Sequence, residues 1–177
     1  MNINYEIYDE SLPQIKEDTL IFKNKTVESY LHGSCHLFAL VFAKKYNLKI
    51  KGLFSEIEAD TESGFIDALD HAYCVLDTNI AIDAKGQNHI SEIKMFSIDS
   101  FNAFEIEDSK EIIESWISNG LLHDFEEGEE ESILAFINEC DRLNLFKKLS
   151  SDEEEVIMDF LENKLEKNKS IITNKLQ

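Results

Sequence analysis

Three residues of this 177-residue chain could do chemistry together: Cys35, His71 and Asp83. A cysteine in the first turn of a helix lies near the positive end of the helix dipole, which stabilises the thiolate relative to the thiol. A nearby imidazole can act as general acid and base, and a carboxylate can orient that imidazole. These residues are therefore candidates for nucleophilic catalysis by a thiolate.

A buried helix over residues 35 to 46 is expected to carry Cys35, because apolar side chains cover nearly its whole circumference. Ser34 is its expected N-cap, with the hydroxyl accepting a hydrogen bond from a first-turn amide. Extended segments should follow, with an acidic loop at residues 58 to 70 and a tight turn at 77 to 79. The predicted strands cover residues 48–57, 71–76, 80–84, 90–98 and 101–106.

Alternation along the strand that begins at His71 puts His71 and Tyr73 on one face and Cys74 on the other. If His71 faces the start of the buried helix, Cys74 faces away from it as a core thiol. His71 and Asp83 lie at similar distances from the centre of the turn, so they should come roughly opposite each other. The pattern predicts an α+β fold, with a buried helix packed on a small, largely antiparallel sheet.

Three segments resemble the transglutaminase-like branch of the papain-like cysteine enzymes: residues 33–40 (GSCHLFAL), 71–73 (HAY) and 82–86 (IDAKG). In that family a cysteine starts the central helix, a histidine opens a strand and an aspartate lies on the next strand. The resemblance implies that Cys35 is the nucleophile, His71 the general acid/base and Asp83 the carboxylate that orients the histidine. The arylamine N-acetyltransferases use a similar order.

The resemblance also implies an oxyanion site and a substrate-binding surface. The backbone amide of Cys35 is one expected oxyanion donor, and Ser34 and His32 are candidates for the second. Tyr73 stands where the family commonly has tryptophan, and it can pack over the site. The implied reaction is acyl transfer on a protein or peptide substrate, without a cofactor. Hydrolysis, deamidation, peptide cleavage and cross-linking share its steps, and the three residues do not choose among them.

Two other interpretations of these residues exist. Cys35 can be a small buried hydrophobe, with His71 and Asp83 a structural strand pair. The pairs His32-x-x-Cys35 and His71-x-x-Cys74 look like halves of a zinc site, but residues three apart on a strand point to opposite faces, so no metal is expected. The odd number of cysteines, with Cys140 the third, predicts free thiols in a reducing compartment.

The charge is strongly negative: 17 Lys and Arg against 36 Asp and Glu, a formal net charge of −19. This disfavours nucleic acid and anionic membrane surfaces as partners. With no apolar run long enough to span a bilayer and no basic leader, a cytoplasmic protein is expected. Much of the acidic excess lies after residue 104, which predicts a catalytic core over residues 1–107 and an acidic helical extension over 108–170 packed on it.

The extension should contain three helices: one capped by Ser109 and ended by Gly120, one over residues 130–149, and one from Ser151. Its glutamate run, residues 126 to 131, is typical of a solvated face. The alternative function is a noncatalytic interaction or inhibitor module on a papain-like scaffold, in which these acidic helices bind a basic protein partner.

Overall fold

The computed structural model describes residues 3–6, 12–60, 64–94 and 100–146. The described residues all belong to one compact unit, Met1–Phe146. The helix predicted from Ser151 lies outside the described residues. In the described ranges, no helix has the length and apolar character needed to cross a bilayer.

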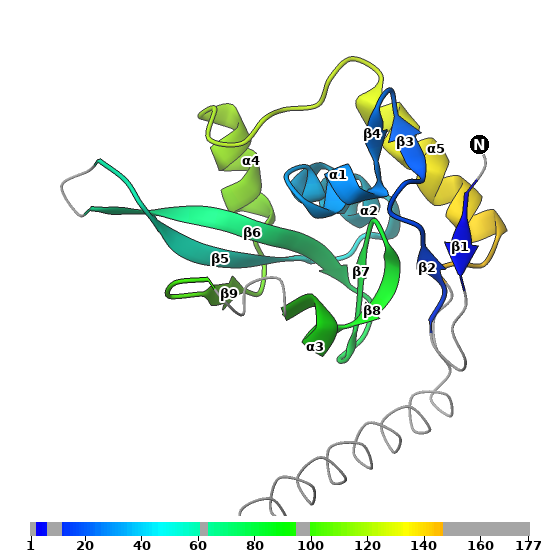
Figure 1. The fold of residues 1–177 in the computed structure, drawn as a ribbon, viewed down its shortest axis with the longest axis horizontal. Helices are drawn as coiled ribbons and strands as arrows, with labels where there is room; N and C mark the ends of the chain where they lie inside the picture. Colours follow the sequence, from blue (N-terminus) through cyan, green and yellow to red (C-terminus); the bar gives the residue numbers. More distant parts are fainter. Residues whose placement is uncertain (1–2, 7–11, 61–63, 95–99, 147–177) are drawn as a thin grey trace, which may run out of the picture. The chain divides into compact units, whose positions relative to one another are not determined.

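The fold is α+β, as predicted, with a seven-stranded sheet in the described part of the chain (Figure 1). Its strand order is β1-β2-β8-β7-β6-β5-β9, and all the neighbouring strands pair antiparallel. These strands are β1 (Tyr5–Glu6), β2 (Gln14–Ile15), β5 (Ile50–Glu58), β6 (Phe65–Val75), β7 (Ile80–Asp83), β8 (Gly86–His89) and β9 (Phe104–Ile106). A separate hairpin consists of β3 (Leu20–Phe22) and β4 (Lys25–Thr26).

Helix α2 (Cys35–Tyr46) is the buried central helix that the sequence predicts, and it begins and ends at the predicted residues. The other helices are α1 (Val27–Leu31), α3 (Ile90–Ile93), α4 (Lys110–Ser118) and α5 (Glu129–Arg142). One apolar core contains Phe38 and Phe42 of α2 together with Ile113 of α4 and Phe136 of α5. Helices α4 and α5 therefore share one core with α2, and α4 also packs on the sheet, where Trp116 meets Phe54 of β5 edge to face.

The long β5–β6 hairpin differs from the prediction. Residues 58 to 70 were expected to be an acidic loop, but β6 begins at Phe65, paired with Glu58. His71 therefore lies well inside a strand instead of opening one. Residues 65–70 (FIDALD) include Phe65 and Ile66, residue types that favour strands, and they belong to a strand that pairs with β5. The loop prediction gave too much weight to the acidic residues of the segment.

Three further boundaries differ after residue 85. Residues 86 to 89 form β8, although the sequence predicts that the hairpin ends there. The strand predicted at 90–98 begins instead with the short helix α3, and residues 95–99 of it lie outside the described range. Helix α5 ends at Arg142 rather than near 149, because Asn144 has a left-handed backbone (φ 55°) that does not continue a helix.

Candidate active site

The Cys35 thiol lies at the first position of α2 and is only 3% exposed. Ser34 occupies the N-cap position, and its carbonyl accepts from the amides of Leu37 and Phe38. The predicted capping bond from its hydroxyl is wrong, since that Oγ lies 3.1 Å from Nε2 of His123. The start of α2 is thus held by a residue of the distant α4–α5 connection.

His71 and Asp83 form a buried pair, with 3.2 Å between Nε2 of His71 and Oδ2 of Asp83. The other carboxylate oxygen accepts from the backbone amide of Lys85 at 2.9 Å and from Nδ2 of Asn88 at 3.1 Å. These two donors fix the orientation of the carboxylate. Asn88 belongs to β8, the strand that the sequence analysis does not predict, so its role there is also missed.

The register of β6 and β7 shows how the pair meets. Cys74 is the partner of Ile82, and continuing this register by one residue puts Asp83 opposite Tyr73. His71 is two residues farther along, so it reaches Asp83 diagonally, instead of roughly opposite it as predicted. A diagonal pair of this kind is within reach of a long side chain such as histidine.

Cys35 and His71 are close enough that each shifts the pKa of the other. Burial acts to raise the pKa of the Cys35 thiol, but hydrogen bonds from His36 and His71 outweigh it and lower that pKa to about 6. Burial acts to lower the pKa of His71, but hydrogen bonds with Asp83 and Cys35 outweigh it and raise that pKa to about 10. The two values favour a thiolate beside an imidazolium at neutral pH.

The orientation predicted for Cys74 is partly wrong. Cys74 is a fully buried core thiol, as predicted, and burial raises its pKa. It nevertheless faces α2, because its Sγ donates to the carbonyl of Ala39. The alternation itself holds, because His71 to Cys74 pair in regular register with Leu53 to Ile50. The face of β6 that carries Ala72 and Cys74 is the one that joins the core around α2.

Tyr73 packs along the imidazole of His71. Its ring is 6.3 Å from that of His71 between centroids, with 18° between the planes. The hydroxyl donates to Oε2 of Glu105 at 2.9 Å, and the side chain is fully buried. Tyr73 therefore supports His71, and in this conformation it has no surface to offer a substrate.

His36 and His123 are site residues outside the predicted set. His36 is fully buried, and its Nε2 donates to the carbonyl of His123 at 2.9 Å. Their rings meet edge to face, 4.7 Å apart. His36 could be suspected from its place next to Cys35. Nothing in the local sequence marks His123, because only the fold brings it to α2.

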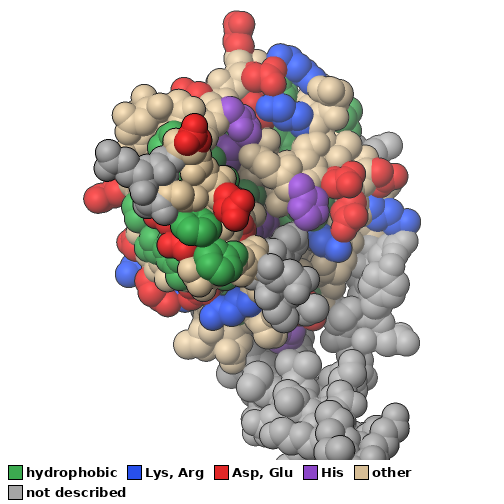
Figure 2. Space-filling view, turned by 60° about the vertical axis from the view of Figure 1, so that its left-hand side comes forward, with side chains coloured by type: hydrophobic (Ala, Val, Ile, Leu, Met, Phe, Trp, Pro, Cys, Tyr) green, Lys and Arg blue, Asp and Glu red, His purple; other side chains and the backbone are tan. Residues whose placement is uncertain are grey.

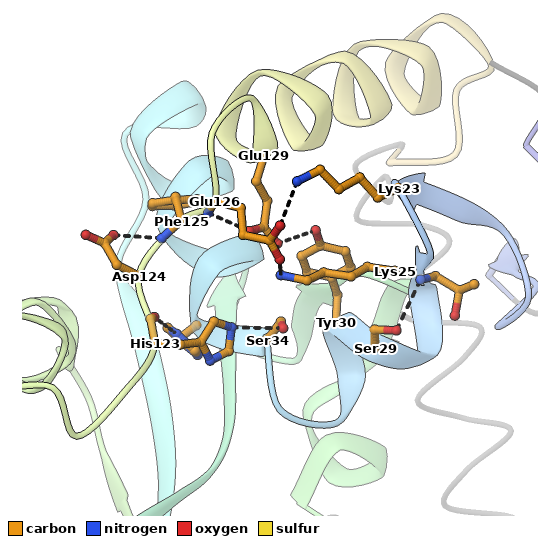
Figure 3. Close-up of polar contacts among 12 residues, drawn as sticks. Lys23, Lys25, Ser29, Tyr30, Ser34, His123, Asp124, Phe125, Glu126 and Glu129 are labelled. Carbon is orange, nitrogen blue, oxygen red and sulfur yellow. Dashed lines mark hydrogen bonds and ion pairs between the residues drawn. The ribbon is translucent and has the colours of Figure 1, made fainter.

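The two contacts of His123 hold the α4–α5 connection over the start of α2 (Figure 3). Replacing His123 with alanine should speed alkylation of Cys35 by iodoacetamide about fivefold, since one hydrogen bond of about 1 kcal/mol would be lost. Mass spectrometry of each cysteine measures this rate. Leu121→Ala, an exposed change in the same connection, should leave the rate unchanged, and equal rates in all three proteins would show that His123 does not cover the thiol.

The remaining predicted residues do not converge on the site as expected. His32 is exposed at the end of α1, and the Ser34 hydroxyl is engaged by His123, so neither is placed as a second oxyanion donor. The alternative zinc site does not form: in the described residues, no group of three His, Cys, Asp or Glu side chains could hold a metal ion. The three cysteines are free and buried.

Much of the glutamate run at residues 126 to 131 makes hydrogen bonds and ion pairs within this chain (Figure 3). Glu129 is fully buried and accepts from Nζ of Lys25 at 2.8 Å and from the hydroxyl of Tyr30 at 2.6 Å. Glu126 pairs with Lys23 at 2.7 Å and with Lys25 at 3.0 Å. The run therefore attaches α5 to the β3–β4 hairpin and α1, instead of forming only a solvated face.

No family model matches the chain, and neither the curated proteins nor the solved structures contain a match to it.

Proposed function

We propose that this chain is a cysteine-dependent acyl-transfer enzyme that forms a thioester on Cys35. The proposal is carried by the buried Cys35–His71–Asp83 series, in which the pKa of the thiol is lowered to about 6 and that of the imidazole raised to about 10. A structural strand pair needs neither a thiol at the start of a helix nor such opposite shifts. Perturbed groups in contact are typical of functional sites.

The proposed reaction uses both ring nitrogens of His71. Since Nε2 is engaged with Asp83, the nitrogen that remains for the thiol is Nδ1. The thiolate of Cys35 attacks the carbonyl carbon of an amide and a C–S bond forms. The imidazolium gives its proton to the leaving nitrogen as the C–N bond breaks. Water or an amine then attacks the thioester and gives a proton to His71, and the C–S bond breaks to restore the thiolate.

The start of α2 supplies the oxyanion donor. The first amides of a helix have no acceptor within it, so the amide of Cys35 can donate to the tetrahedral oxyanion. We assign the α+β fold to the transglutaminase-like branch of the papain-like enzymes. This assignment is supported by a cysteine that begins the buried helix and by His71 and Asp83 on neighbouring strands.

The noncatalytic alternative has less support. It requires acidic helices that are available to a basic partner, yet Glu126, Glu129 and Glu130 all pair with lysines of this chain.

The test is acylation by p-nitrophenyl acetate, a small ester that needs no extended substrate site. The wild type should release a burst of p-nitrophenol and carry one acetyl group on Cys35, found by mass spectrometry of the peptides. Cys35→Ala should lose both signals, while Cys74→Ala, which removes another buried thiol, should keep them. Acetylation spread over other residues, or a burst that survives Cys35→Ala, would rule the proposal out.

A further inference from the structure

Among the described residues, strand β6 has an edge without a partner strand next to the proposed catalytic histidine. It pairs with β7 only at Cys74 and Val75, and β7 ends at Asp83. In the described part of the chain, β5 is the only strand paired with Ile66–Leu69, and Asp70 lies at the register shift. Figure 1 shows the β5–β6 hairpin extending well beyond β7 and β8.

Exposure decreases along this edge toward the site. Ile66 and Asp67 are exposed, Ala68 to Asp70 are half-buried, and His71 is fully buried. The edge therefore leads from the surface to His71 and so to the neighbouring thiol of Cys35. A chain lying along it would end at the reacting atoms.

A strand edge of this kind presents backbone N–H and C=O groups that can pair with a further strand. An extended peptide can add to such an edge, with the main chain giving affinity and alternate side chains giving specificity. Lysine and proline commonly block edges, and Ile66–Asp70 contains neither.

The charge around the edge selects the kind of peptide. Residues 52 to 70 contain six acidic residues and no lysine or arginine. At the inner end of the edge, Oδ1 of Asp70 accepts from the hydroxyl of Ser55 at 2.7 Å, while Oδ2 is buried without a hydrogen-bond partner in the described structure. This charge repels a second copy of an acidic chain and attracts a basic one.

Apolar side chains accompany the acids. Ile57 and Ile66 are cross-strand partners, 46% and 43% exposed. Figure 2 shows hydrophobic and acidic side chains next to one another on the side of the molecule that carries the hairpin. A strand that alternates basic and apolar residues matches both features.

We propose that the Ile66–Asp70 edge of β6 binds an extended basic segment of a protein or peptide substrate as an added strand, and brings its acyl group to Cys35. This inference rests on the proposed function and names its substrate class. The edge supplies backbone pairing, Asp67 and Asp70 supply charge, and Ile57 and Ile66 supply apolar contact.

Binding can be measured without turnover in the full-length Cys35→Ala protein. The probe is a fluorescein-labelled heptapeptide of alternating lysine and leucine with a central glutamine, followed by fluorescence anisotropy. A glutamate-for-lysine version should bind at least about tenfold more weakly because of like-charge repulsion. A version with alternate backbone amides N-methylated keeps the charge but loses strand hydrogen bonds, and it should also weaken about tenfold or more.

Matched charge reversals locate the site. Asp67→Lys should weaken binding of the lysine peptide about fivefold to tenfold. Glu131→Lys makes the same change in net charge at an exposed position of α5, and it should change the binding of the lysine peptide less than twofold. Equal losses in the two variants, or full binding of the N-methylated peptide, would reduce the interaction to nonspecific charge attraction and overturn the proposal.

The outcome is separable from that of the proposed function. If the ester acetylates Cys35 but the lysine peptide does not bind, the edge proposal fails and the acyl-transfer proposal stands. If the peptide binds the edge but Cys35 does not react, the acyl-transfer proposal fails, and with it the assignment of the bound peptide as a substrate. Dimers that compete with the peptide would assign the edge to a second copy of the chain and overturn the proposal.

Discussion

Replacing His71 with alanine should raise the pKa of the Cys35 thiol from about 6 toward its ordinary value of 9.0. The imidazolium that stabilises the thiolate is then gone and burial still favours the neutral form, while His36 remains beside the thiol and keeps part of the lowering. The ultraviolet absorbance of the thiolate, followed against pH in wild type and variant, measures this change. The rate of acetyl transfer should fall about 100-fold to 10,000-fold, because the general acid/base is lost as well.

The Cys35–His71 pair predicts a bell-shaped pH dependence for the rate at which the wild type transfers an acyl group from an amide. Below about pH 6 the sulfur of Cys35 is protonated, and above about pH 10 His71 has lost the proton that the leaving group needs. The rate should therefore rise as pH increases through 6 and fall as it increases through 10. His32→Ala, a change to an exposed histidine, is the control and should keep the wild-type curve. A thiolate titration that is the same in His71→Ala as in wild type would contradict the pairing.

Replacing Glu129 with alanine should lower the free energy of unfolding by about 3 kcal/mol, measured by urea denaturation. Glu129 is fully buried, and its removal leaves the Lys25 ammonium and the Tyr30 hydroxyl without their carboxylate. The Lys25 side chain is 20% exposed, so water recovers part of the loss and the value lies at the low end for a broken buried pair.

Glu130→Ala is the matched control on the same helix. Glu130 pairs with Lys44 at 2.7 Å, but the two side chains are 43% and 75% exposed, so its loss should cost less than about 0.5 kcal/mol. Burial acts to raise the pKa of Glu129, but its hydrogen bonds with Lys25 and Tyr30 lower it overall. The stabilisation is therefore complete above the ordinary glutamate pKa and is lost as pH falls through the lowered value. If Glu129→Ala and Glu130→Ala lower the free energy of unfolding equally, the buried contacts of Glu129 with Lys25 and Tyr30 do not have the stabilising role described.

The centre of the site could be predicted because its residues have local signatures. Cys35 precedes a helix that is apolar on nearly all sides, and His71 and Asp83 lie on either side of a recognisable turn. The supporting residues have no such signature. Asn88 lies in a polar strand that breaks the hydrophobic pattern, and His123 reaches α2 only through a contact between residues 89 positions apart.

The elements of the fold also divide into those with a local sequence signature and those without one. The continuous apolar pattern of α2 gives its bounds, because burial on all sides leaves few alternatives. Residues 65–70 of β6 are extended because they pair with β5, whereas the acidic residues around them led to the prediction of a loop. A prediction from one segment at a time therefore finds the helix that carries Cys35 but not the length of the strand that carries His71.

The contacts of His123 have a consequence for when the site exists during protein synthesis. His123 meets Ser34 and His36 across 89 and 87 positions of the chain, and Tyr30 meets Glu129 across 99. Contacts this distant in sequence form late and slow the folding of a domain. A nascent chain that has emerged only through β8 has Cys35, His71 and Asp83 but not His123, which contacts the start of α2. The complete set of contacts around Cys35 thus forms only after the α4–α5 connection has been made, and translation itself sets the moment at which it forms.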